Sequence, residues 1–163
     1  RSRSTPVMDR KAAAIVTDML TAVIREGTGR RAAGLQRPIA GKTGTTNDLY
    51  DAWFVGYTPW YTTGVWVGFD NERSLGKGET GSRAASPIWL AFMQRILEGK
   101  PVRVFQVPEG VVFAKIDAET GLLPISESPR TIFECFKEGT APTDYAKRPG
   151  QVTEPEEFYK SGM

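Results

Sequence analysis

The sequence contains no histidine and only one cysteine, Cys135, among its 163 residues. Without histidine, the chain cannot itself supply a Ser-His-Asp triad, a Cys-His dyad or a histidine ligand for a metal ion. With one cysteine, it has neither an internal disulfide nor a Cys-x-x-Cys pair for zinc. Any chemistry that this chain carries therefore depends on Ser, Thr, Lys, Tyr or carboxylate side chains.

Long apolar runs and a strong charge bias are also missing. No run approaches the roughly 20 residues of a membrane-spanning helix, and no segment has the features of a signal peptide. The 21 basic and 19 acidic residues leave a formal net charge of +2, which is too small to indicate nucleic acid as a partner. A composition of 40% hydrophobic and 25% charged residues is typical of a globular protein.

Two helices are predicted from apolar residues that recur every three or four positions. The first spans residues 9–26, with Asp9 as its N-cap and Gly27 as a left-handed stop. The second spans residues 86–98, with Ser86 as its N-cap. The apolar side of the second helix contains Ile88, Trp89, Phe92, Met93, Ile96 and Leu97.

Three extended segments are predicted between the helices, at residues 37–45, 52–58 and 62–69. A short Pro-containing turn separates the second from the third, which predicts an antiparallel hairpin. The glycine-rich stretches 27–34 and 70–85 are predicted loops. Two helices packed with a small antiparallel sheet make an α+β fold.

The pattern changes after Lys100. Residues 104–107 and 111–117 are predicted strands, and residues 117–121 form a predicted tight turn. Residues 132–136 are an apolar run whose type the pattern leaves open. The last twenty or so residues are rich in Pro, Lys and Glu, a composition that predicts poor order.

The most informative segment is AGKTGTTND, residues 40–48. Its Gly41-Lys42-Thr43 ends like the phosphate-binding loop of a nucleotide-binding protein, which would make the chain a P-loop NTPase. That motif needs a glycine at position 36, where the sequence has Gln36, and a helix after Thr43. Gly44 and the β-branched Thr45 and Thr46 do not favour a helix, so this alternative is disfavoured.

The same residues match the KTG element of serine acyl enzymes. The segment GKTGTTND is followed by DAWFVGYTP, then by TGVWVGFDN and SLGKGETG. This order closely resembles the end of the transpeptidase domain of class A, or bifunctional, penicillin-binding proteins. The resemblance is strong over residues 9–99 and weaker in the tail. It implies a C-terminal portion of the transpeptidase domain at residues 1–100 and a C-terminal extension, partly β and partly disordered, at 101–163.

The motif suits peptide binding on physical grounds. In a strand, Lys42 and Gly44 lie on one face, and Thr43 and Thr45 on the other. An edge strand that lacks a Cβ at Gly44 can pair with an extended peptide. Lys42 then supplies positive potential and helps proton transfer, and the Thr45 hydroxyl can donate to a carboxylate. The resemblance implies that the backbone N–H of Thr45 is one arm of the oxyanion hole.

The nucleophile of the family is absent from this chain. The family places a Ser-x-x-Lys motif and then a Ser-x-Asn motif before KTG, and neither precedes Lys42 here. Ser74 and Lys77 have the right spacing but follow KTG, and Gly76 and Gly78 disfavour the helix on which such a pair sits. We therefore expect a fragment that holds one wall of the site and is inactive alone.

The resemblance implies a D,D-transpeptidase that cross-links peptidoglycan stem peptides, is inhibited by β-lactams and needs no cofactor. It also implies a membrane-anchored parent at the periplasmic side of the bacterial inner membrane, with a glycosyltransferase domain upstream. A partial penicillin-binding fold then pairs the strand at residues 62–69 with the missing N-terminal half. Left unpaired, this strand is expected to self-associate. A non-catalytic module that binds stem peptides or β-lactams is the alternative.

The surrounding sequence also predicts roles for several other residues. Most aromatic side chains are expected in the core, with Trp53 and Tyr57 as alternatives for lining a substrate groove. Asn47 and Asp48 are expected to shape the turn after the KTG strand, and Cys135 is expected to be packed. A basic group is expected to be solvated, with a role beside anionic peptidoglycan or lipid as the alternative. It contains Arg25, Arg30, Arg31 and Arg37.

Overall fold

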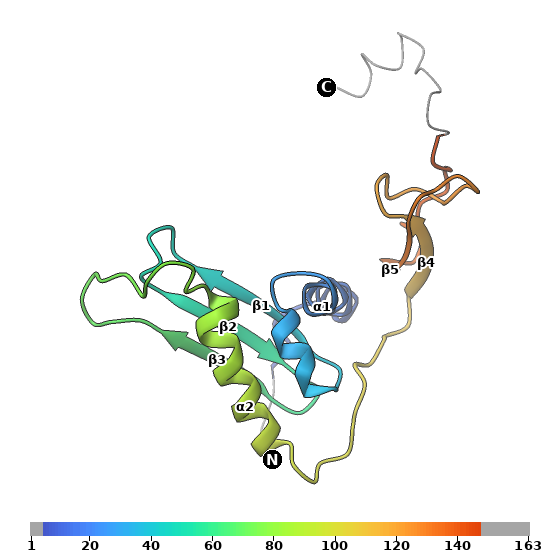
Figure 1. Cartoon of the computed structure of the whole chain (residues 1–163). Coiled ribbons are helices and arrows are strands. Elements are labelled where there is room, and N and C mark those ends of the chain that lie inside the picture. The colour runs from blue at the N-terminus through green and yellow to red at the C-terminus, as the bar shows by residue number, and fades with distance from the viewer. Residues whose placement is uncertain (1–4, 148–163) are drawn as a thin grey trace. The chain divides into compact units, whose positions relative to one another are not determined.

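The computed structural model describes residues 5–147, and the chain divides into two compact units, Arg1–Glu109 and Gly110–Met163. Figure 1 shows the α-helices and a three-stranded sheet in the first unit and a strand pair in the second. These helices and antiparallel strands confirm the predicted α+β class. Neither described α-helix has the length and apolarity that a membrane crossing requires. The division at residue 100 into a transpeptidase portion and an extension stays a prediction.

Helix α1 spans Arg10–Arg25 and begins as the sequence predicts. The carboxylate of Asp9 accepts hydrogen bonds from the backbone N–H groups of Lys11 and Ala12, both at 3.0 Å. These two groups belong to the first turn and have no partner within the helix, so the cap satisfies them.

The end of α1 differs from the prediction. Gly27 does not adopt a left-handed conformation. Instead, its N–H and that of Gly29 donate to Val23 O, at 3.0 and 3.1 Å. The chain tightens into a short 3-10 helix, η1 (Arg30–Leu35), where a loop is predicted. Close packing favours glycine at position 27, because a Cβ there would lie 3.0 Å from the backbone Cα and O atoms of Val23.

The sheet has the order β1-β2-β3, and neighbouring strands are antiparallel. The strands span Ala40–Thr45, Ala52–Tyr57 and Thr62–Val67. This arrangement confirms the predicted hairpin, although β1 starts later than residue 37 and β3 ends before residue 69. The late start has a backbone cause: Gln36 has a left-handed φ of 55°, and Pro38 has no N–H to donate.

Helix α2 (Ser86–Ile96) is entered through a π-helical turn, η2 (Gly81–Ala85). The predicted loop over residues 70–85 is confirmed only for residues 70–80, because residues 81–85 form η2. The predicted N-cap at Ser86 is wrong. Ser86 already has helical angles, φ −61° and ψ −38°, and its N–H donates to Gly81 O. Because the π turn supplies this acceptor, α2 needs no side-chain cap. The Ser86 hydroxyl is fully buried and has no hydrogen-bond partner among the described residues.

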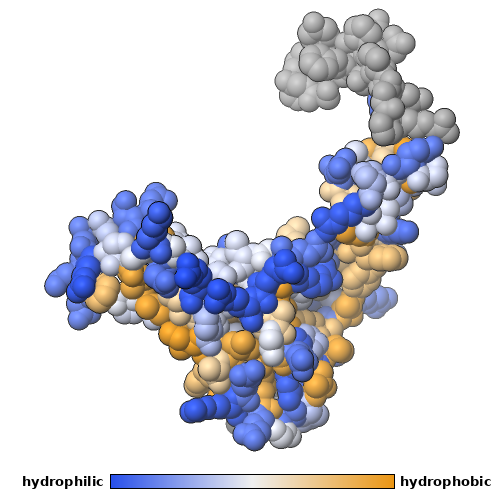
Figure 2. All heavy atoms as spheres, viewed as in Figure 1, coloured by the Kyte–Doolittle hydropathy of each residue, from blue (hydrophilic) through white to orange (hydrophobic). Residues whose placement is uncertain are grey.

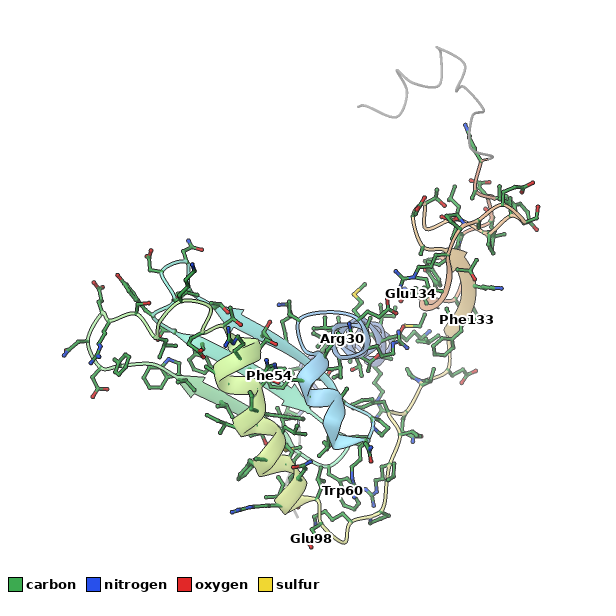
Figure 3. The ribbon with its side chains drawn as sticks, in the orientation of Figure 1. Arg30, Phe54, Trp60, Glu98, Phe133 and Glu134 are labelled. Atoms are coloured by element: carbon green, nitrogen blue, oxygen red, sulfur yellow. The ribbon has the colours of Figure 1, made fainter. Side chains whose placement is uncertain are left out.

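Helix α2 packs on one face of the sheet through Trp89. The rings of Phe54 and Trp89 meet edge to face, with centroids 5.1 Å apart, and Figure 3 shows Phe54 in the sheet next to α2. The indole N–H of Trp89 donates to Thr63 O at 3.0 Å. Gly56 makes room for this ring, because a Cβ there would lie 2.9 Å from Trp89 Cζ2. The contact joins α2 to both β2 and β3.

The buried side of α2 is narrower than predicted. Trp89, Met93 and Leu97 are buried, whereas Ile88 and Phe92 are about half exposed. Figure 2 shows hydrophobic residues at the surface in the region of α2. The three-stranded sheet is too small to cover the full apolar side, so part of it faces solvent in this chain.

No strand forms at residues 104–107, where one is predicted. This segment is held by side chains at the β2–β3 turn instead of by a partner strand. The guanidinium of Arg103 lies 3.7 Å from the ring centroid of Trp60, and the rings of Tyr57 and Phe105 meet edge to face at 5.6 Å. Figure 3 shows Trp60 beside the segment that follows α2.

The second unit contains an antiparallel pair, β4 (Val111–Asp117) and β5 (Thr131–Lys137). Strand β4 confirms the prediction for residues 111–117, and the apolar run whose type was open is part of β5. Cys135 is buried, as predicted for a packed cysteine. The predicted poor order of the C-terminal tail falls, from residue 148 onward, outside the described residues.

Asp117 closes the predicted tight turn. The N–H of Gly121 donates to Asp117 O at 2.9 Å. The Asp117 carboxylate accepts from the Ser128 hydroxyl and from the N–H groups of Thr120 and Glu119. These hydrogen bonds, that of Ser128 foremost, lower the pKa of Asp117 from 3.8 to about 2. The turn thus stabilises the charged carboxylate.

Replacing Trp89 by Ala is expected to lower the free energy of unfolding by about 3–5 kcal/mol, because a fully buried indole leaves a cavity and Thr63 O loses a donor. The neighbouring Ile88→Ala, at a half-exposed position, is the matched control and is expected to cost less than about 1 kcal/mol. Urea unfolding followed by circular dichroism measures both. Equal losses in the two variants would contradict this packing.

Asp117→Asn is expected to change how stability depends on pH. The folded pKa lies below the unfolded one, so the carboxylate stabilises the fold fully above pH about 4 and loses this effect as the pH falls toward 2. The difference in unfolding free energy between wild type and Asp117→Asn should therefore shrink over this range. Glu119→Gln, at an exposed position in the same turn, is the control. A difference that stays constant from pH 5 to pH about 2 would refute the assignment.

Candidate functional site

The KTG residues lie in an extended edge strand. Among the described residues, β1 pairs with β2 and with no other strand, and Figure 1 shows β1 at the border of the sheet. The first half of the strand, Ala40 and Gly41, is buried, whereas Lys42 and Thr45 are exposed. The second half of β1 is therefore the open part of this edge.

The hydrogen-bond pattern determines where the backbone groups of β1 point. The N–H of Thr46 donates to Asp51 O at 3.1 Å, and this pair continues the β1–β2 register. Opposite residues in an antiparallel pair alternate between bonded and non-bonded positions. Counted back from Thr46, the residues in the open half of β1 that do not bond to β2 are Thr43 and Thr45. Their N–H and C=O groups therefore point to the open edge.

The Lys42 ammonium lies at this edge. Nζ donates to the outward carbonyl oxygen of Thr43 at 2.9 Å. By the register, Lys42 shares its sheet face with Val55, and Gly44 shares it with Trp53. No carboxylate in the described part of the chain forms an ion pair with Lys42. A cation without an ion-pair partner beside outward backbone groups suits an anionic end of an extended peptide.

The Thr43 side chain lies on the opposite face and has a partner that the sequence did not reveal. Its hydroxyl is 2.7 Å from that of Thr28, in the link between α1 and η1. The available signal is the triplet Gly27-Thr28-Gly29, which lies in a predicted loop. This hydroxyl pair joins the end of α1 to the KTG strand.

Thr45 also has an unforeseen partner, Gly81, the first residue of η2. The N–H of Gly81 donates to Thr45 Oγ1 at 3.0 Å. Gly81 is buried, and a Cβ there would overlap the carbonyl oxygens of Trp53 and Gly44. The sequence signal was the glycine that ends SLGKGETG.

Thr46 closes the loop between β1 and β2. Its hydroxyl oxygen accepts from the N–H groups of Tyr50 and Asp51, both at 2.9 Å. Asn47 and Asp48 were expected to shape this turn, yet neither side chain forms a hydrogen bond within residues 5–147. The side chain that organises the loop is that of Thr46.

Both competing sequence motifs lack the required geometry. Residues 43–45 are strand and residues 46–51 form the hairpin loop, so no helix follows Thr43 as a phosphate-binding loop requires. The Ser74-to-Lys77 segment is not helical, as predicted. Gly76 and Gly78 have positive φ angles of 112° and 79°, which a helix does not contain.

The two candidate groove aromatics lie at different places. Trp53 lies on the Lys42 face, is 45% exposed, and its ring centroid is 6.4 Å from that of Trp66. Tyr57 lies opposite Ala40 at the far end of β1, and its hydroxyl is 2.9 Å from that of Thr17 on α1. Trp53 is therefore the one adjacent to the open half of β1.

The four arginines of the basic group differ in their surroundings. Arg37 donates to Leu97 O at 3.1 Å and to Pro101 O at 3.3 Å, which places a cation at the C-terminal end of α2. Arg25, Arg30 and Arg31 are exposed, and Arg30 is labelled in Figure 3. A role for them beside anionic peptidoglycan or lipid stays a prediction. Within residues 5–147, no three His, Cys, Asp or Glu side chains gather where a metal ion could bind.

Two family models match the chain. Residues 2–94 match the penicillin binding protein transpeptidase domain, and residues 107–149 match the penicillin-binding protein 1A C-terminal domain. Among curated relatives, Penicillin-binding protein 1A of Pseudomonas aeruginosa is 46% identical over 146 residues. That of Aquifex aeolicus is 43% identical over 136 residues. These alignments cover 88% and 83% of this chain.

A solved structure is similar as well. The crystal structure of Penicillin-Binding Protein 1A from Haemophilus influenzae superposes with a TM-score of 0.76 at 36% identity and covers 86% of this chain. The chain spans 22% of that structure, and 18% and 19% of the two curated relatives. It therefore corresponds to about a fifth of their length.

Thr46→Val is expected to lower the free energy of unfolding by about 1–2 kcal/mol, because the N–H groups of Tyr50 and Asp51 lose a shared acceptor. Asn47→Ala, in the same exposed loop, is the control and is expected to change stability by less than about 0.5 kcal/mol. Chemical denaturation of both variants makes the comparison. A larger loss for Asn47→Ala would restore the role first assigned to that residue.

Proposed function

The chain belongs to the transpeptidase-domain family of penicillin-binding proteins, and from this premise we propose that it is part of a peptidoglycan D,D-transpeptidase. In this proposal the chain supplies the peptide-binding edge of the site, and a serine nucleophile comes from sequence upstream of residue 1. The observation that carries the proposal is the open half of β1, where Thr43 and Thr45 direct N–H and C=O groups outward.

An extended stem peptide that ends in D-Ala-D-Ala would add to this edge as a further strand. Main-chain hydrogen bonds to Thr43 and Thr45 would hold it in register. The approach is close at Gly44, which has no side chain on the substrate side. The Lys42 ammonium would leave Thr43 O and attract the terminal carboxylate of the peptide.

The proposed chemistry is acyl transfer through a serine ester. The serine oxygen attacks the carbonyl carbon between the two D-Ala residues, the C–N bond breaks, and the terminal D-Ala leaves as an amine that takes up a proton. The amine of a second stem peptide then attacks the ester and releases the serine. The outward N–H of Thr45 would donate to the oxyanion, and Lys42 would assist proton transfer. No step calls on a metal ion or a cofactor.

Strand β3, at the other edge of the sheet, supports the proposal that part of the transpeptidase domain lies outside this chain. By the same alternation, Thr62, Gly64 and Trp66 direct their N–H and C=O groups away from β2. Within residues 5–147, no strand pairs with this edge of β3. We propose that the N-terminal half of the transpeptidase domain pairs there, and that the isolated chain self-associates through residues 62–69.

The setting follows from the same premise. The parent protein would be membrane-anchored at the periplasmic side of the bacterial inner membrane, with a glycosyltransferase domain upstream. A module that binds stem peptides or β-lactams without catalysis is the second candidate, and the absence of Ser-x-x-Lys before Lys42 favours it for the chain taken alone. The sequence upstream in the parent gene separates the two, because a catalytic parent must contain both Ser-x-x-Lys and Ser-x-Asn.

Labelling with a fluorescent penicillin tests the proposal. The 163-residue chain is expected to show no covalent label, whereas the longer protein that contains it is expected to label at one site per molecule. Lys42→Ala in the longer protein should slow labelling by about 100-fold or more, as expected for loss of a group that transfers protons and binds the carboxylate. Lys77→Ala, another exposed lysine next to a glycine, is the matched control and should label normally.

Stoichiometric labelling of the isolated chain would refute the external nucleophile. A longer protein that binds penicillin reversibly but never becomes acylated would support the non-catalytic module instead.

A further inference from the structure

The hydrogen bond from Gly81 to Thr45 affects the orientation of the Thr45 hydroxyl. We propose that Gly81 is a positioning residue, whose N–H orients the Thr45 hydroxyl so that its proton is directed to the terminal carboxylate of the substrate or β-lactam. The inference rests on the proposed function and adds a residue from outside the KTG strand to that site.

The hydrogen bond limits what the hydroxyl can do. A threonine hydroxyl has one donor hydrogen and two acceptor positions. At 3.0 Å, the Gly81 N–H occupies one acceptor position of Thr45 Oγ1, so the hydroxyl hydrogen must point elsewhere. Thr45 is exposed, and its hydroxyl donates to no other group among the described residues. The bond thus leaves an oriented donor at the open edge of β1.

Gly81 can hold this orientation because rigid groups fix its own position. Its Cα side faces two backbone carbonyls, Trp53 O and Gly44 O, and a Cβ would overlap both. Backbone atoms within a paired strand cannot give way as a flexible side chain can. The φ angle of Gly81 is not positive, so the glycine is required for space and not for an unusual backbone conformation.

A second hydrogen bond fixes the same segment. The N–H of Leu75 donates to Leu49 O at 2.8 Å, in the β1–β2 loop. Residues 75–81 are therefore attached at both ends to the end of the hairpin that carries Thr45. Behind Gly81, the π turn leads directly into α2, whose Trp89 is packed on the sheet. The donor N–H of Gly81 therefore belongs to a buried and well-packed part of the unit.

The test uses the longer protein and compares two ligands, benzylpenicillin and its methyl ester, which lacks the carboxylate charge. The measured quantity is the ratio of their second-order acylation rate constants. Thr45→Val is expected to reduce this ratio by about tenfold or more, the effect of one hydrogen bond to a charged group. Gly81→Ala is expected to reduce the ratio at least about threefold, because the added Cβ pushes the N–H away from Oγ1.

The double variant shows whether Gly81 acts through Thr45. If it does, Gly81→Ala changes the ratio less than about twofold when Thr45 is already Val. Gly56→Ala is the matched control. Gly56 lies in the same sheet, and a Cβ there would meet Phe54 and the Trp89 ring of α2 but not Thr45. This variant is expected to lower thermal stability and to leave the ratio unchanged.

The outcomes separate this inference from the proposed function. A longer protein that is not acylated at all refutes the function. If the longer protein is acylated, and the ratio of rate constants falls in Thr45→Val but not in Gly81→Ala, the role of Gly81 is refuted. A fall in the ratio for Gly56→Ala equal to that for Gly81→Ala would also refute it, because the effect would then be general destabilisation.

If Gly81→Ala does not fold, amide hydrogen exchange of Gly81 decides. Slow exchange is expected in the wild type and in Thr45→Ser, which keeps the acceptor, and faster exchange is expected in Thr45→Val. Rapid exchange of the Gly81 N–H in the wild type would overturn the proposal.

Discussion

The antiparallel pairing of β1 with β2 is the constraint on which the rest of the first unit depends. The register places Thr43 opposite Phe54 and Lys42 opposite Val55. A slip of one residue would move Lys42 to the face that α2 covers and turn the outward backbone groups of Thr45 toward β2. Two contacts oppose such a slip: the loop closed by the Thr46 hydroxyl, and the seat of Phe54 against Trp89.

Two glycines between the sheet and the η2–α2 segment determine how closely these elements approach each other. Gly56 admits the Trp89 ring to the sheet, and Gly81, in the turn before α2, rests on backbone carbonyls of β1 and β2. The other face carries Trp53, Val55 and Trp66, each about 45% exposed. Among the described residues, the three-stranded sheet therefore has one well-packed face, one open apolar face and a free edge on each of its two outer strands. This asymmetry agrees with a chain that spans about a fifth of its relatives' length.

The KTG strand is held by contacts from two separate parts of the chain and by one contact within the strand itself. Thr28 after α1 contacts Thr43, the outward carbonyl of Thr43 accepts from Lys42, and Gly81 before α2 contacts Thr45. Each contact involves a hydroxyl or a main-chain group beside the open edge. These contacts order the edge from within the unit, which would reduce the conformational entropy lost in the proposed peptide binding.

The elements with local sequence signals could be predicted without the structure. The spacing of apolar residues and the capping carboxylate of Asp9 predict α1, alternation predicts the hairpin, and Lys42 to Thr45 identify the strand that carries the motif. Local signals failed where a distant contact decides. The Ser86 cap was wrong because η2 supplies an acceptor. No strand forms at residues 104–107, where Phe105 packs on Tyr57 and the preceding Arg103 stacks on Trp60.

Only the tertiary structure showed which groups of the motif face the open edge and what holds them. Gly81 meets Thr45 across 36 residues of chain, and no period or propensity encodes a contact over that separation. The physical reason is that periodicity reports which face of an element is buried, whereas the orientation of a single hydroxyl depends on the one N–H that the completed fold brings to it.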